Sequence, residues 1–292
     1  DIVLNQADST INTNSTNVTL DAEFVGSGDV VTLNQGGDVT LFNAGDGVEV
    51  DGGTGYSGGL TVFTDSLGSG DTVVVKTSTA ATTVNGDGGT VNVDATALID
   101  NTDLTLNGSS EVNVTSLQGD VQAASSAGGL DIETISGASV EVVTGTGDAT
   151  ISSDSGDVTV DADQMTGINT LTIDGSSTYT VNNVATGVVV DANDDAATSG
   201  DAPLTGTLTV NTDAGASGVE VYTGTAATTV NSDTSNGGTI TVEADELADD
   251  TALTLTGAAA VTVNDLVGDV SGGSATGTLT VTTADNAVAS GD

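Results

Sequence analysis

Val91-Asn-Val-Asp-Ala-Thr-Ala-Leu98 decides the fold, because the chain repeats its pattern twice more. The pattern is a β-branched residue, a polar residue, Val, an acidic residue, Ala, two variable positions, and Leu or Met. It returns as Val158-Thr-Val-Asp-Ala-Asp-Gln-Met165 and Ile240-Thr-Val-Glu-Ala-Asp-Glu-Leu247. A second motif follows each copy, in Leu104-Thr-Leu-Asn-Gly108, Leu171-Thr-Ile-Asp-Gly175 and Leu253-Thr-Leu-Thr-Gly257. A long period built from short β-type segments is typical of a solenoid.

Equivalent strand openings define this long period. They lie at Leu60, Leu130, Leu208 and Leu279, and the middle interval is the longest. We therefore predict an N-terminal β segment at 1–59, repeat units at 60–129, 130–207 and 208–278, and the start of a fourth unit at 279–292. The extra length of the middle unit, around Asp191 to Pro203, indicates a loop insertion. Because the chain begins without Met and stops inside this fourth unit, we expect it to be a segment of a longer protein.

A shorter spacing between strand-like segments recurs inside each unit. In the third unit, strand-like segments open at unequal intervals, at Leu208, Val219, Thr228, Ile240, Leu253 and Val261. Polar residues alternate with Val, Leu and Ile, which indicates strands with one buried face. We predict an all-β parallel β-solenoid (β-helix) with two or three strands and about 20–30 residues per turn. An antiparallel β-sandwich array would have the same spacing of strands and remains an alternative, but it does not explain why whole units recur.

The composition excludes several partners. The 292 residues include one Lys or Arg, 42 Asp and Glu, no His and no Cys, and the formal net charge is −41. Nucleic acid and anionic lipid surfaces need more cationic side chains than this chain has. No apolar run approaches the length of a membrane span, so we expect no membrane insertion, and the N-terminus has no secretion-signal pattern.

The same composition argues against catalysis. Without His and Cys the chain lacks common bases, nucleophiles and transition-metal ligands. Phosphoryl transfer lacks its Lys and Arg clamps. Paired carboxylates suffice for glycoside cleavage, but Asp and Glu are so frequent here that pairs in the sequence carry little information. We expect no enzymatic activity.

Many of the acids fall at Gly-rich turns. Stacked turns would bring carboxylates together, and two of them one strand spacing apart repel by about 1 kcal/mol in water. Ca²⁺ accepts carboxylates and backbone carbonyls in flexible geometry and would remove this repulsion. The candidate Ca²⁺ ligands are Asp29, Asp46, Asp51, Asp71, Asp120, Asp157, Asp161, Asp191, Asp194, Asp245, Asp249 and Asp269. The alternative is that these acids are simply solvated and keep the protein soluble.

Other features have structural interpretations. Leu98, Met165 and Leu247 are expected to fill the corners of turns, and Lys76 is expected on the surface near acids. Thr is frequent at outward strand positions, where it favours β structure. A flat Thr array could also order water in an ice-binding face. That use requires two-dimensional regularity, and the unequal intervals between strand openings argue against it.

A family resemblance follows from a few of these residues. Asp51-Gly-Gly-Thr-Gly-Tyr-Ser57 resembles a degenerate calcium-binding nonapeptide of RTX proteins, with Ser57 where Asp is expected, and Gly26-Ser-Gly-Asp29 and Gly68-Ser-Gly-Asp71 resemble half of it. The wider Thr/Val/Asp/Gly repeat is similar to bacterial surface-layer proteins and giant type-I-secreted adhesins. This resemblance implies an extracellular, Ca²⁺-stiffened solenoid with a C-terminal export signal outside this segment.

The expected function is therefore structural. We predict a cell-surface, Ca²⁺-stabilised solenoid segment of an S-layer, sheath or surface filament that assembles with copies of itself into a homo-oligomer, lattice or filament, with divalent cations as partners. The alternative is the stalk or binding region of a giant secreted adhesin, with cell-surface polysaccharide as a ligand of regions outside this segment.

Overall fold

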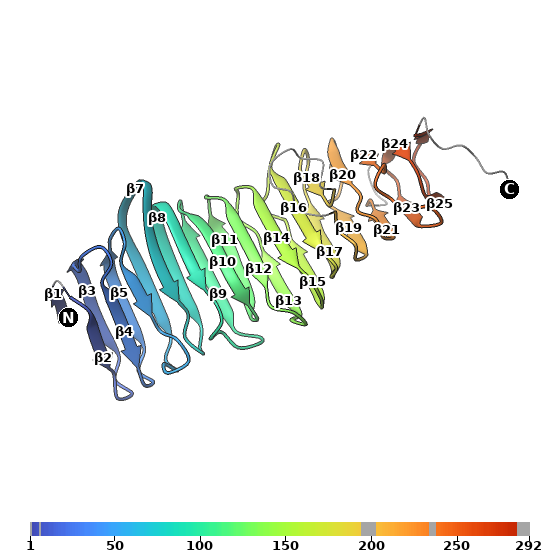
Figure 1. The fold of residues 1–292 in the computed structure, drawn as a ribbon. Helices are drawn as coiled ribbons and strands as arrows, with labels where there is room; N and C mark the ends of the chain where they lie inside the picture. The colour runs from blue at the N-terminus through green and yellow to red at the C-terminus, as the bar shows by residue number, and fades with distance from the viewer. Residues whose placement is uncertain (1, 6, 194–202, 234–237, 285–292) are drawn as a thin grey trace. The chain divides into compact units, whose positions relative to one another are not determined.

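The structure is a computed structural model and describes residues 2–5, 7–193, 203–233 and 238–284. Among these residues every regular element is a strand (Figure 1). The first strands are β1 (Ile2–Asn5), β2 (Ser9–Asn12), β3 (Val18–Phe24), β4 (Val30–Asn34), β5 (Val39–Ala44), β6 (Glu49–Asp51), β7 (Leu60–Lys76), β8 (Thr82–Asp94), β9 (Asp103–Gly108), β10 (Glu111–Leu117), β11 (Asp120–Ser126), β12 (Leu130–Thr134) and β13 (Val140–Val143). The others are β14 (Ala149–Ser153), β15 (Asp157–Asp161), β16 (Thr170–Gly175), β17 (Thr178–Val184), β18 (Val189–Asp191), β19 (Leu208–Thr212), β20 (Val219–Tyr222), β21 (Thr228–Asn231), β22 (Thr239–Glu243), β23 (Ala252–Gly257), β24 (Ala260–Leu266), β25 (Asp269–Ala275) and β26 (Leu279–Thr283).

The strands stack as a parallel β-solenoid, as the sequence predicted. The chain divides into two compact units, Asp1–Ala149 and Thr150–Asp292. Within each unit a strand pairs in parallel with the strand two places further along, as β3 does with β5 and β20 with β22. Odd-numbered and even-numbered strands therefore form two separate faces, with two strands per turn. The predicted strand openings of the third repeat are correct to within one residue.

The strands β7 and β8 are exceptions, because each runs through a corner and contributes to both faces. They pair with each other from Leu60 and Thr82 to Lys76 and Asp94. The N-terminal part of β7 also pairs with β5, and its C-terminal part pairs with β6. Two continuous strands thus join the two faces of the first unit.

A narrow aliphatic core lies between the faces. Inward side chains alternate along each strand, so that Leu60, Val62, Val73 and Val75 of β7 are buried while the residues between the members of each pair are half-exposed. The predicted corner residues Leu98, Met165 and Leu247 are all at most 1% exposed, which confirms that they fill corners. In these turns the Leu98 amide donates to the Ala95 carbonyl at 3.0 Å, and the Met165 turn is closed in the same way.

A recurring bulge lets two inward residues stand three positions apart. In β10, Val114 and Leu117 are both buried, the register shifts between them, and Ser116 has a φ of 59°. Asn183 in β17 and Asp265 in β24 take the same left-handed conformation inside the same kind of bulge. Short polar side chains tolerate this conformation better than β-branched ones, which explains the polar residue at this position.

The tyrosines give a prediction for alkaline solution. Burial raises the pKa of Tyr56 to about 12, and it also raises the pKa of Tyr179 and of Tyr222. A raised pKa means that the fold favours the neutral phenol. This stabilisation of the fold is fully present below the ordinary tyrosine pKa of about 10. It is lost as the pH rises through the higher pKa values that the tyrosines have in the folded chain.

We therefore expect tyrosinate absorbance to appear together with alkaline unfolding, and not as a separate step near pH 10. A pH titration followed by ultraviolet absorbance and circular dichroism in parallel measures this. A tyrosinate signal that is complete while the dichroism remains native would contradict it.

No helix with the length and apolarity to cross a membrane occurs in the described part of the chain.

Candidate functional site

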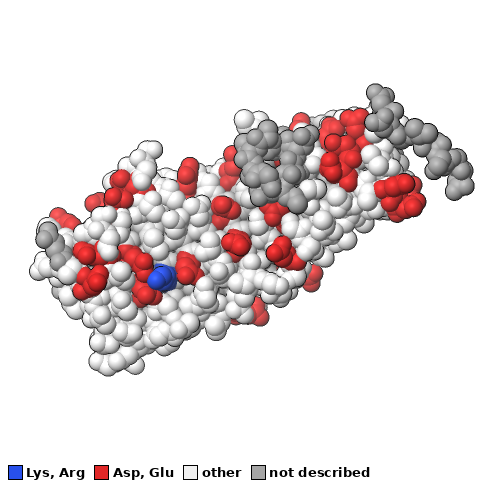
Figure 2. Space-filling view, in the orientation of Figure 1, with Lys and Arg blue, Asp and Glu red and all other residues white. Residues whose placement is uncertain are grey.

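The even-numbered strands and the C-terminal part of β7 carry charged residues at the ends of their outward surface, and we call this surface the charged face. In the first unit, register places Thr32, Asp51, Lys76, Asp94 and Thr115 in one column. Figure 2 shows the lysine, the only blue residue, among acidic side chains. The single cation of the chain is therefore built into a column of carboxylates, in agreement with the prediction that Lys76 lies near acids.

Lys76 forms the ion pairs of this column. Its Nζ lies 2.5 Å from Oε1 of Glu49 and 3.7 Å from Oδ2 of Asp51. The hydrogen bond to Glu49, followed by the charges of Asp51, Glu49 and Asp94, raises the pKa of the lysine, and partial burial opposes these effects. The one ammonium is thus engaged within the molecule and does not balance the remaining acids.

Removing this ammonium should weaken the fold modestly. We expect Lys76→Met to lower the free energy of unfolding by about 1 kcal/mol at low salt, because the pair is partly exposed and screened. The methionine keeps the apolar stem but leaves Glu49 and Asp51 without a counter-charge. Urea unfolding at low and high salt measures the effect. The double variant with Glu49→Gln should lose less than the single variant, and equal stability of Lys76→Met and the parent at low salt would refute the role.

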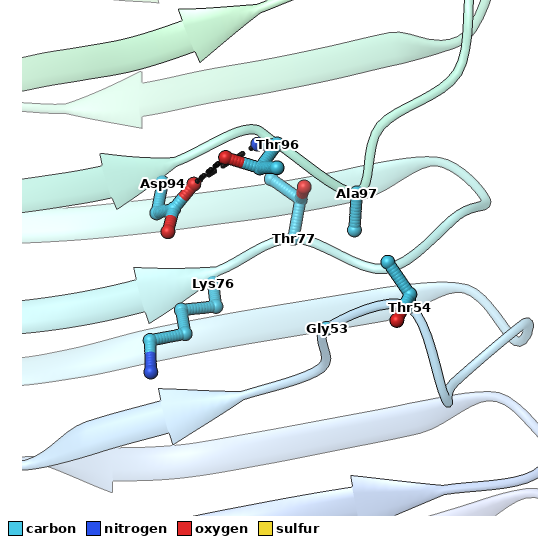
Figure 3. A pocket seen from close by; sticks show the side chains of 7 residues that line it. All are labelled: Gly53, Thr54, Lys76, Thr77, Asp94, Thr96 and Ala97. Carbon is cyan, nitrogen blue, oxygen red and sulfur yellow. Dashed lines mark hydrogen bonds between the residues drawn. The ribbon is translucent and has the colours of Figure 1, made fainter.

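A shallow hollow of about 180 Å³ lies at the corner next to this column (Figure 3). It is lined by Gly53, Thr54, Lys76, Thr77, Asp94, Thr96 and Ala97. Asp94 accepts hydrogen bonds on Oδ1 from the amide and the hydroxyl of Thr96, at 3.0 and 2.5 Å. Thr77 is fully buried, and its Oγ1 has no hydrogen-bond partner among the described residues. The corner therefore offers one unsatisfied hydroxyl beside a capped carboxylate.

The second unit has an equivalent corner without a cation. Tyr222 takes the place of Lys76, between Asp191 and Glu243 in the column, and the adjacent Thr223 is again buried with an Oγ1 that has no partner among the described residues. Burial raises the pKa of the Tyr222 phenol, and the charges of Glu220, Glu243 and Asp191 add to this effect. Both units therefore have a buried threonine hydroxyl at this corner, but the residue before it is Lys76 in the first unit and Tyr222 in the second.

Several carboxylates outside these corners cap the backbone of the next turn. Asp46 accepts a hydrogen bond from the amide of Thr72 at 3.0 Å, and Asp120 accepts one from the amide of Glu141 at 2.8 Å. Asp8 and Asp38 cap other strands in the same way. These acids satisfy backbone amides of the next turn, which is a structural role that needs no metal.

Other predicted ligands act within their own turns. Asp29 accepts from the amide of Gly26 at 3.1 Å and Asp71 from that of Gly68 at 2.8 Å, so the two Gly-Ser-Gly-Asp segments form the same closed turn. Asp249 accepts from the adjacent amide. In the nonapeptide-like segment, Tyr56 is fully buried and its hydroxyl lies 2.6 Å from the carbonyl oxygen of Gly37.

The remaining predicted ligands lie in different places. Asp161 accepts hydrogen bonds from the amide of Asp163 and from Asn183. Asp191 and Asp245 meet at Asn193, which donates to them at 3.0 and 3.4 Å. Asp51 belongs to the Lys76 column, Asp157 and Asp269 are exposed at the starts of β15 and β25, and Asp194 lies outside the described residues.

No group of three or more acids arranged to hold a metal ion occurs among the described residues. The pKa of Asp213 is raised by burial and then by the charges of Asp163 and Asp161. The described residues therefore show no such acid cluster within one chain, and Ca²⁺ binding stays a prediction.

No family model, curated protein or solved structure matches the chain. The sequence alone did not indicate the two buried hydroxyls of Thr77 and Thr223. The shared segment Thr79-Ala-Ala-Thr-Thr-Val-Asn85 and Thr225-Ala-Ala-Thr-Thr-Val-Asn231 was the available signal, because each hydroxyl lies two residues before it.

Proposed function

We propose that the chain is a structural segment of an extracellular, cell-surface protein and that it assembles with copies of itself into an S-layer, sheath or filament. The observation that supports this is a regular parallel solenoid whose single cation is already paired with Glu49 and Asp51. The described surface offers carboxylates, hydroxyls and, at the first corner, a small shallow hollow. Such a surface suits packing between long regular faces better than capture of a small molecule.

Assembly then depends on dissolved cations. Copies that carry a net charge of −41 repel each other, and Lys76 is not available to offset this. Exposed acids such as Asp157 and Asp269 can contribute oxygen ligands when two copies meet. Ca²⁺ suits this role because it accepts six to eight oxygen ligands in flexible geometry, with carboxylates from both copies.

The experiment compares the full chain in Ca²⁺, in chelator, and in monovalent salt of equal ionic strength. We expect filaments or sheets by electron microscopy and a large scattering mass only with Ca²⁺, reversed by chelation. Equal assembly in monovalent salt would show that screening is sufficient and would remove the Ca²⁺ bridge. Monomers under every condition would reject self-assembly and favour the adhesin stalk, which needs no contact between copies.

A further inference from the structure

The odd-numbered strands and the N-terminal part of β8 present a repeated outward pattern, and we call this surface the threonine face. In the second unit one column consists of Thr159, Thr180, Thr209, Thr229 and Thr254, paired in register. Two residues further along the same strands, a second column consists of Asp161, Asn182, Asn211, Asn231 and Thr256. From β17 to β23 neither column contains a charged residue.

The first unit has the same arrangement. Its threonine column is Thr19, Thr40, Thr61, Thr83 and Thr105. The second column contains Phe42, Phe63, Asn85 and Asn107, of which the two phenylalanines stack with ring centres 4.7 Å apart. From β5 to β9 neither column contains a charged residue.

Side-chain hydrogen bonds fix the second column. Asn211 donates to Asn182 and Asn231 donates to Asn211, both at 2.8 Å, and the hydroxyl of Thr256 donates to Asn231 at 2.7 Å. Asn107 and Asn85 are joined in the same way in the first unit. A ladder of this kind holds its side chains in one geometry before any ligand arrives, which lowers the entropic cost of binding.

Irregular spacing in the sequence does not disturb this array. Asn182 and Asn211 are 29 residues apart and Asn211 and Asn231 only 20, yet all three stand in one column. The turns absorb the differences, and the strands keep their register, so the threonines beside these asparagines are aligned as well. The objection that unequal intervals in the sequence exclude two-dimensional regularity therefore does not hold for this face.

The charged face is an internal control for strand propensity. Its strands have the same parallel pairing, and Thr would favour β structure there equally well. Its outward columns nevertheless contain Glu49, Asp51, Lys76 and Asp94 in the first unit and Glu220, Tyr222 and Glu243 in the second. In the second unit the threonines that follow one another in register on this face are only Thr241, Thr262 and Thr280. Propensity alone therefore does not account for two columns of five threonines each on the other face.

We propose that the threonine face binds the crystal lattice of ice. Neighbouring strands repeat at about 4.8 Å, so the threonine column repeats its hydroxyl and methyl groups at this spacing. The second column lies about 6.6 Å further along the strands, and the two columns together form a two-dimensional grid. A grid of this kind is useful to a partner that is itself periodic on this scale, and ice presents water oxygens in such planes. Between β5 and β9 and between β17 and β23 the grid carries no charge, whereas the ionised groups of the charged face orient water around themselves and do not match a lattice.

The test uses the monomeric full chain in chelator, so that its outcome is separate from Ca²⁺-dependent assembly. Slow growth of ice from a dilute solution measures partition of the protein into the crystal, and a cooled single crystal measures thermal hysteresis and faceting. The strip variant is Thr83→Tyr with Thr229→Tyr, one bulky side chain in each threonine column. The matched control is Thr32→Tyr with Thr241→Tyr, at half-exposed positions of the charged face. Tyrosine keeps high β propensity in both.

We expect the parent and the control to enter ice and to shape it, and the strip variant to lose both properties while its melting temperature matches that of the control. Exclusion of the parent from ice, to the level of an acidic protein of similar size, would overturn the proposal. Equal ice binding by the strip variant and the control would also overturn it. If the tyrosine pair does not fold, Thr83→Lys with Thr229→Lys is used instead and its results are judged by the same criteria.

Discussion

Replacing Gly108 with alanine will lower the free energy of unfolding by about 2–5 kcal/mol, from backbone strain and overpacking together. Gly108 has a φ of 102°, and an added Cβ would lie 1.9 Å from the carbonyl oxygen of Gly86 in the neighbouring turn. Gly175 and Gly257 repeat this geometry, with positive φ and approaches of 2.1 and 1.9 Å to the carbonyls of Ser153 and Ser232. The last glycine of the second sequence motif is therefore required by close contact between turns.

Gly137 provides the matched control. Its φ of 84° is also positive, but an added Cβ would meet no atom within 4 Å. Gly137→Ala should therefore lose only the conformational part, about 1–2 kcal/mol. Urea unfolding followed by circular dichroism compares the two variants. If they lose equal stability, the contact with Gly86 contributes nothing and the motif has only a backbone role.

The sequence predicted the features of the fold that depend on period and alternation. The motif from Val91 to Leu98 places β-branched residues inward and fills a corner with Leu98, and the structure confirms both. The recurrence of whole units in the sequence predicted that the strands stack in parallel. The number of strands per turn could not be predicted, because the unequal intervals between strand openings are compatible with two or three strands.

The surroundings of individual acids could not be predicted, because they depend on register between turns. Asp120 caps the amide of Glu141, 21 residues later, and Asp46 caps that of Thr72, 26 residues later. Lys76 meets Glu49 only because β6 pairs with the end of β7. The prediction that turn acids bind Ca²⁺ stays a prediction, and the structure adds that several of them, such as Asp29 and Asp71, accept hydrogen bonds from backbone amides.

Met165→Ala should lower the free energy of unfolding by about 2–5 kcal/mol, the usual loss when a large buried side chain is truncated. Met165 is fully buried in the turn between β15 and β16, where its amide donates to the carbonyl of Ala162 at 3.0 Å. The backbone hydrogen bond remains in the variant. The loss therefore reports the apolar contacts of the corner and the cavity that the missing side chain leaves.

Ile168, three residues further along the same turn, is 93% exposed and serves as the control. Ile168→Ala removes a side chain of similar size from the same local structure, so it should change stability by no more than about 0.5 kcal/mol. Both variants are compared with the parent by urea unfolding and by thermal melting in the same buffer. A thin solenoid core has few apolar contacts per turn, so that each corner residue matters for the stacking of its neighbours. Similar losses in the two variants would mean that the corner is held by its backbone hydrogen bonds and not by the buried side chain.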